Sequence, residues 1–240
     1  MAMRHRNLLK YIILCAFTIG SIPSAGQEKT EHPDWIPARP GVETPDPAES
    51  RLTDAAYSVL SQQATSWLPE HQQAAIDGIA EMIAAGTIDA DDPVAVDILY
   101  KIAGQSFLRT TTPQRNDPVQ IRLAAIRLLA KGGTAVESQL LSILSRDPND
   151  AIAAEAAFAL REHILDDHSL RILSQRLRRN RHAAPSDRLT YAILLIVYEN
   201  AIEGPVPDSL VEEVLLTFSG PYVREVRELA ARILRILSEW

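Results

Sequence analysis

Residues 121–129 read IRLAAIRLL, and residues 226–234, near the other end of the chain, read VRELAARIL. Laid over one another, the two stretches share an apolar first residue, an arginine second, an alanine fifth and a leucine ninth. Residues 152–160 keep the apolar positions, the alanine and the leucine, and residues 188–196 keep chiefly the alanine and the apolar spacing. The matched alanines are 31, 36 and 38 positions apart, at Ala125, Ala156, Ala192 and Ala230. Periods of this length indicate repeated structural units that stack on one another.

The whole region around these stretches has the pattern of helices. From Arg51 onward, apolar residues recur every three or four positions, as at Ile76, Ile79, Ala80 and Ile83, and hardly ever alternate with polar ones. This periodicity predicts about ten helices and no strand over residues 51–240. The predicted fold class is therefore all-α.

Three Asp-Pro pairs mark expected helix starts, at residues 92–93, 117–118 and 147–148. In each pair the aspartate supplies a side-chain acceptor for the N-cap, and the proline, which lacks an N–H group, suits the first helical position. Glycines then fall between the apolar stripes, where a chain turns after a helix ends. The sequence predicts pairs of antiparallel helices.

The order of these motifs resembles the HEAT-repeat family of α-solenoids. Residues 135–160 look like one whole unit, with Ala135 and Val136, then the Asp-Pro pair, then residues 152–160. The likeness is good over residues 92–160 and 209–237 and weaker elsewhere, and only Arg122 and Arg227 keep the arginine of the family. The resemblance implies a right-handed α-solenoid of about five antiparallel helix pairs, which binds another protein as a noncatalytic scaffold or adaptor. The alternative is a non-repeating all-helical domain.

The amino terminus has the three parts of a secretory signal peptide. Residues 1–10 contain three basic residues and no acidic one, residues 11–22 are apolar, and residues 23–26 are small and turn-forming. The apolar run of about 12 residues is shorter than the roughly 20 that a transmembrane helix needs. We expect cleavage near Gly26 and export to the periplasm or the medium. Cleavage would remove Cys15, the single cysteine, and with it any disulfide or thiol chemistry.

Residues 27–50 are expected to form a linker between the signal peptide (residues 1–26) and the repeat domain (residues 51–240). They contain five prolines and six acidic residues and almost no apolar ones. A sharper alternative is that Trp35 and Ile36 dock on the folded body or on a partner. The whole chain has 24 Lys and Arg against 31 Asp and Glu, a net charge of −7 that argues against nucleic-acid binding.

No catalytic, metal or cofactor motif is found in the sequence. It contains no His-Glu-x-x-His, no Gly-x-Ser-x-Gly and no glycine-rich phosphate loop. The cluster Glu162, His163, Asp166, Asp167 and His168 spans an expected helix end and the next helix start, which favours capping over metal binding. The pair Glu212 and Glu213 is expected on an exposed face. We predict a protein that is not an enzyme and needs no cofactor.

One basic stretch, residues 171–188, interrupts the acidic background with Asp187 as its only acid. Its candidate binding residues are Arg171, Arg176, Arg178, Arg179, Arg181 and His182. The stretch is either a solvated helix face or an anion-binding patch, because guanidinium groups suit carboxylates and phosphates. In the second case the protein would bind an anionic polymer or a membrane surface in the envelope. Single-stranded nucleic acid is not expected, since no aromatic residues interleave with the arginines.

Overall fold

The structure, a computed structural model, describes residues 47–108, 118–183 and 185–239. Over these ranges the chain is all-helical and has no strand, which confirms the predicted fold class. The expected signal peptide, residues 27–46 of the expected linker, and Trp35 and Ile36 lie outside the described residues. Within the described ranges, no helix has both the length and the apolar character needed to cross a membrane.

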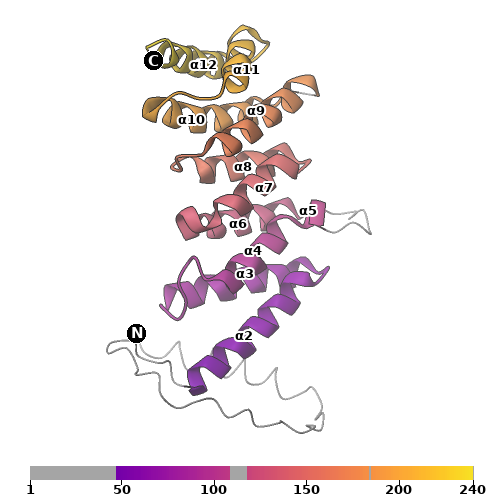
Figure 1. The fold of residues 1–240 in the computed structure, drawn as a ribbon. Helices are drawn as coiled ribbons and strands as arrows, with labels where there is room; N and C mark the ends of the chain where they lie inside the picture. The colour runs from indigo at the N-terminus through magenta and orange to yellow at the C-terminus, as the bar shows by residue number, and fades with distance from the viewer. Residues whose placement is uncertain (1–46, 109–117, 184, 240) are drawn as a thin grey trace, which may run out of the picture. The chain divides into compact units, whose positions relative to one another are not determined.

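Figure 1 labels the helices in the order in which they follow one another along the chain. They are α2 (Pro47–Thr65), α3 (Pro69–Ala84), α4 (Pro93–Ala103), α5 (Gln105–Leu108), α6 (Val119–Leu129), the 3-10 helix η1 (Ala130–Val136), α7 (Glu137–Arg146), α8 (Asp150–Leu160), α9 (Asp167–His182), α10 (Asp187–Glu203), α11 (Asp208–Ser219) and α12 (Arg224–Leu237). Helix α2 begins four residues before the expected start of the helical region at Arg51, because a proline suits the first turn of a helix. The contacts divide the chain after Ser58, inside α2, and the packing below is that within Val59–Trp240.

Within this unit the helices pack in two series. Helix α4 packs on α6, α7 on α8, and α11 on α12, so that neighbours in sequence form pairs. Helices α6, α8, α10 and α12 also pack one after another, and α7, α9 and α11 form a second series (Figure 1). The four alanines matched in the sequence all lie in the first series and have no exposed surface: Ala125, Ala156, Ala192 and Ala230. A small side chain at the same place in each helix lets neighbouring helices approach closely, since close-packed interiors leave no room for a larger one.

The three Asp-Pro pairs have different outcomes. Asp92 caps α4 as predicted, and its carboxylate accepts hydrogen bonds from the backbone N–H groups of Val94 and Ala95, both at 3.0 Å. Asp117 lies outside the described residues, and Pro118 occupies the N-cap of α6. At the third pair the prediction was wrong, because Asn149 caps α8 and accepts from the N–H group of Ala151 at 2.9 Å.

Asp147 instead ends α7 and takes part in a buried polar junction with α6. The carboxylate forms an ion pair with Arg122, and neither side chain has exposed surface. Arg122 Nε also donates to the Ala103 carbonyl at 2.8 Å, and Ser106 Oγ donates to Asp147 at 2.7 Å. The second carboxylate oxygen accepts from the Asn149 N–H group at 2.9 Å. Asp147 therefore joins two successive helix pairs, which leaves the cap to Asn149.

Candidate interaction surfaces

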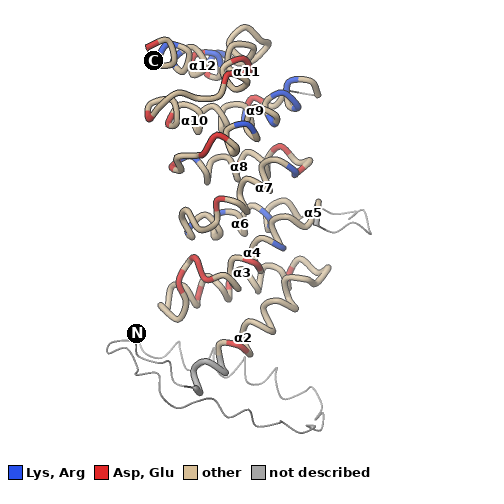
Figure 2. Tube along the Cα trace, in the orientation of Figure 1, with Lys and Arg blue, Asp and Glu red and all other residues tan. Residues whose placement is uncertain are grey.

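Helix α9 carries the basic stretch that the sequence singled out. It starts at a cap in which Asp166 Oδ1 accepts from the Ser169 N–H group at 2.8 Å. Hydrogen bonds from the backbone and the hydroxyl of Ser169 hold the pKa of Asp166 below its usual value. This capping role was predicted for the cluster at residues 162–168. Leu170, Leu173 and Leu177 are buried along one side of α9. Figure 2 marks the arginine positions of this helix in blue.

Two of the predicted binding residues hold α9 against the helix pair before it. The Arg176 side chain is 5% exposed and donates to Asp150, at the start of α8, at 2.9 Å. Burial lowers the pKa of the Arg176 guanidinium, and the charge of Asp150 opposes this effect. Arg179 donates to the backbone carbonyl of Ser145, in α7, at 2.8 Å.

Two further predicted residues face α11. Arg178 Nε lies 2.9 Å from Glu213 Oε1, and Arg181 Nε lies 3.3 Å from Glu213 Oε2. The Glu213 side chain is 1% exposed, which contradicts the expectation that Glu212 and Glu213 both lie on an exposed face. Glu213 is buried because it pairs with two arginines of the neighbouring helix. Glu212 remains exposed, 3.8 Å from Arg178.

The other two predicted residues, Arg171 and His182, are exposed and pair with no residue that the structure describes. The structure thus brings all six predicted residues onto one helix, where four of them bind acids or carbonyls of neighbouring helices. The sequence could not indicate these partners, because they lie 26 to 35 positions away.

His163 is the buried member of the cluster at residues 162–168. Its Nδ1 lies 3.5 Å from Glu137 Oε2, whereas Glu162 and His168 are exposed. Across the described ranges, no group of three or more His, Cys, Asp or Glu side chains is placed to hold a metal ion.

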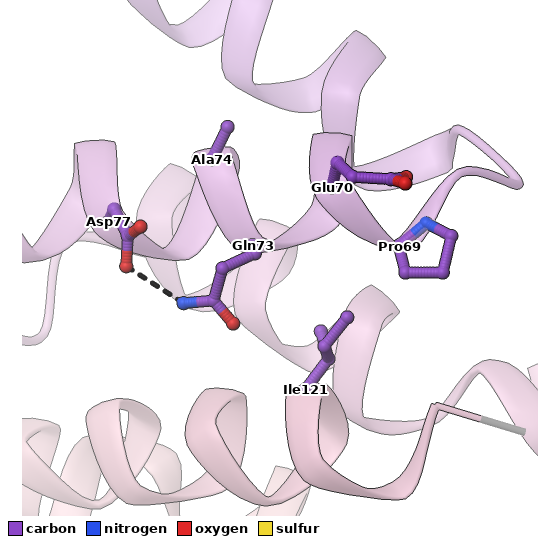
Figure 3. A pocket seen from close by; sticks show the side chains of 6 residues that line it. All are labelled: Pro69, Glu70, Gln73, Ala74, Asp77 and Ile121. Carbon is purple, nitrogen blue, oxygen red and sulfur yellow. Dashed lines mark hydrogen bonds between the residues drawn. The ribbon is translucent and has the colours of Figure 1, made fainter.

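A shallow depression lies between α3 and α6 (Figure 3). It is lined by Pro69, Glu70, Gln73, Ala74, Asp77 and Ile121. Gln73 donates to Asp77 at 2.8 Å, so two of its polar groups already satisfy one another. The depression is open to solvent.

A second surface was not predicted from the sequence. It is the solvent-facing side of α8 and α10, which we name the α8–α10 face, and it consists of Glu155, Phe158, Glu162, Arg188, Tyr191, Leu195, Glu199 and Ile202. Phe158 is 37%, Tyr191 36% and Ile202 46% exposed, and Leu195 is half-buried. In α10 these apolar residues follow at steps of four and seven, which places them on one side of the helix. Neighbouring helices thus leave an apolar strip uncovered.

At one end of this face, Glu155 and Arg188 form an ion-paired cluster with Arg127, which lies in the neighbouring helix α6. Glu155 Oε1 accepts from Arg127 Nε, in α6, at 2.6 Å, and Glu155 Oε2 lies 3.2 Å from Arg188 Nη2. The carboxylate side chain is only 14% exposed, whereas the Arg127 and Arg188 side chains are 62% and 56% exposed. Both carboxylate oxygens are engaged, so the exposed charge here is positive.

Helices α8 and α10 run in the same direction. Glu155 contacts Arg188, near the amino-terminal end of α10. Near the carboxyl-terminal end of α10, the Asn200 carboxamide accepts from the N–H group of Leu165, which follows α8, at 2.7 Å. Phe158 and Tyr191 therefore each lie one turn beyond the Glu155 and Arg188 pair, on neighbouring helices. The two aromatic residues therefore follow the ion-paired Glu155 and Arg188 along the two helices.

Comparison of the chain with protein-family models, with curated proteins and with solved structures gives no match.

Proposed function

We propose that the protein is an exported, noncatalytic α-solenoid of the HEAT-repeat type that binds another protein as a scaffold or adaptor in the cell envelope. The repeat period, the two series of packed helices and the four buried alanines support the solenoid. In such an architecture each unit contacts its neighbours, and the row of units presents an extended surface for binding. The amino-terminal pattern of residues 1–26 supports export.

The observation that carries the binding role is the α8–α10 face. Exposed aromatic and aliphatic side chains grouped on adjacent helices are typical of protein-binding surfaces, in which aromatic residues and arginine are enriched. The face also combines its apolar strip with arginines at one edge, so it can offer both buried area and directed hydrogen bonds.

The alternative, an anion-binding patch on α9, would bind through charge alone, because none of the exposed large apolar residues of the described ranges lies on α9. Arg176, Arg178 and Arg181 lie against carboxylates of the same chain, which leaves Arg171, Arg179 and His182 as its basic side chains without a carboxylate partner among the described residues. We therefore place the partner on the α8–α10 face.

The proposal is tested by capture of envelope proteins on the immobilised full-length chain, at low and at high salt. The test variant is Phe158→Ala/Tyr191→Ala, which removes the two aromatic rings of the face. Its matched control is Leu215→Ala/Phe218→Ala, because these α11 residues are also exposed, by 53% and 46%. A third variant, Arg171→Glu/His182→Glu, reverses the free charge on α9. Circular dichroism confirms that each variant is folded.

We expect one defined protein that survives high salt, is retained by the α11 control and the α9 variant, and is lost with Phe158→Ala/Tyr191→Ala. Loss in the α9 variant alone, with release at high salt, would establish the anion patch in place of this proposal. Equal capture by all four proteins would remove the α8–α10 face from the binding role.

A further inference from the structure

The α8–α10 face has charges of opposite sign at its two ends. The end formed by Arg127, Glu155 and Arg188 carries two positive charges and one negative charge, and the negative one is largely covered. Arg127 uses its Nε and Arg188 one terminal nitrogen for Glu155, so each guanidinium keeps N–H groups that hold no described partner. This end can therefore accept a further carboxylate.

The opposite end is acidic. Glu162, which follows α8, is exposed, and Glu199 lies on the same side of α10 as Tyr191 and Leu195. Neither glutamate forms an ion pair with any residue in the described ranges. Arg161 is also exposed near this end, which leaves the two glutamates in excess by one charge.

The apolar strip separates these ends by a defined length. Arg188 and Glu199 are eleven positions apart in α10, which corresponds to about 16 Å along the helix axis. A helical segment of about three turns, or an extended segment of about five residues, spans this distance. Its apolar side chains would contact Phe158, Tyr191 and Ile202 between the charged ends.

The surface ends at α12. Within the described ranges, none of the exposed large apolar residues lies in α12, whose exposed residues include Arg224, Glu225, Glu228 and Arg232. Arg224 is already paired with Glu228 at 2.6 Å. The strip is therefore a bounded site on α8 and α10 and does not continue along the series.

From this complementarity we infer that the partner of the α8–α10 face is a short amphipathic segment of a protein with carboxylates at one end, which Arg127 and Arg188 bind. This inference rests on the proposed function and specifies the chemistry of the same site. The arginines set the orientation of the segment, because carboxylates placed at the opposite end would meet Glu162 and Glu199.

The experiment measures fluorescence anisotropy of labelled synthetic peptides titrated with the full-length protein. The acid-ended probe is DELLQQLLQALQQ, the neutral probe is QQLLQQLLQALQQ, and the base-ended probe is KKLLQQLLQALQQ. The test variant is Arg127→Gln/Arg188→Gln, which removes the positive charge without adding a negative one. The matched control is Arg224→Gln/Arg232→Gln, which removes two exposed arginines of α12.

We expect the acid-ended probe to bind more tightly than the neutral probe, and Arg127→Gln/Arg188→Gln to weaken its binding about tenfold. The neutral probe should bind this variant and the wild type alike, and the α12 control should leave both affinities unchanged. The base-ended probe should respond instead to Glu162→Gln/Glu199→Gln.

Equal affinity of the wild type for the acid-ended and neutral probes would overturn the inference, and so would an acid-ended probe that is insensitive to Arg127→Gln/Arg188→Gln. Either result leaves the proposed function standing if envelope capture still depends on Phe158 and Tyr191. Loss of that dependence would instead refute the proposed function, whatever the peptides show.

Discussion

Arg122 in α6 and Asp147 at the end of α7 form an ion pair in which both side chains are completely buried. Ser106 and the Ala103 carbonyl also form hydrogen bonds with this pair, so helices α4, α6 and α7 meet at a polar junction. A charged side chain can be buried in this way only while its oppositely charged partner remains in place, because an unpaired buried charge is strongly destabilising.

Replacing Arg122 with alanine should therefore be strongly destabilising. The change leaves the Asp147 carboxylate buried without its cation, and the expected loss is about 3–5 kcal/mol in the free energy of unfolding. Urea denaturation followed by circular dichroism measures it. Arg227→Ala is the matched control, because Arg227 holds the same place in its repeat but is exposed. It should change stability by about 0.5 kcal/mol or less, and a similar loss for both variants would contradict a special role of the junction.

Glu213→Ala should destabilise the protein, by less than Arg122→Ala does. The buried Glu213 carboxylate joins Arg178 and Arg181 of α9 to α11, but both arginines are partly exposed and can turn to water when it is lost. The measurement is the urea midpoint beside that of Glu212→Ala, since Glu212 is exposed. An effect of Glu212→Ala as large as that of Glu213→Ala would mean that burial of Glu213 contributes nothing.

The sequence predicted the helical fold from residues whose role is local or periodic. The spacing of Ala125, Ala156, Ala192 and Ala230 identified four positions that are all buried. Asp92 could be assigned as a cap because a capping side chain bonds the N–H groups of residues two and three positions later in the sequence. Asp147 and Glu213 could not be distinguished from exposed acids, since their partners belong to other helices. Whether an acid is buried depends on how the helix pairs stack, and neither the composition nor the repeat period determines that stacking.

The α8–α10 face escaped sequence analysis for a different reason. Residues 150–160 read DAIAAEAAFAL and are apolar on nearly every side of the helix, so no period marks Phe158 as exposed. Tyr191 and Leu195 likewise lie in a largely apolar run. Conversely, the basic stretch was conspicuous in the sequence, although its acidic partners are visible only in three dimensions.

The cap of α9 should make stability depend on pH through Asp166. Because the folded-state pKa of Asp166 is lowered, this carboxylate stabilises the fold above its ordinary pKa of 3.8, and the contribution disappears as the pH falls through the lower folded-state value. Asp166→Asn should therefore be less stable than the wild type at neutral pH, and the difference should shrink below pH 3.8. Urea midpoints across this pH range test it. Asp167→Asn is the control, because the Asp167 side chain accepts no hydrogen bond from the described residues, and a difference independent of pH would contradict the assignment.

Enlarging one of the repeated alanines tests whether these positions set the distance between helices. Ala156 has no exposed surface and lies between helices that pack on both sides of α8, so Ala156→Leu must displace a neighbour. The expected cost is about 1–3 kcal/mol, typical of overpacking in a close-packed core. Ala151→Leu is the control in the same helix, because Ala151 is only half-buried and leucine has nearly the helix propensity of alanine. Urea denaturation should show a clear loss for Ala156→Leu and a small one for Ala151→Leu, whereas equal losses would mean that alanine recurs there for reasons other than close approach.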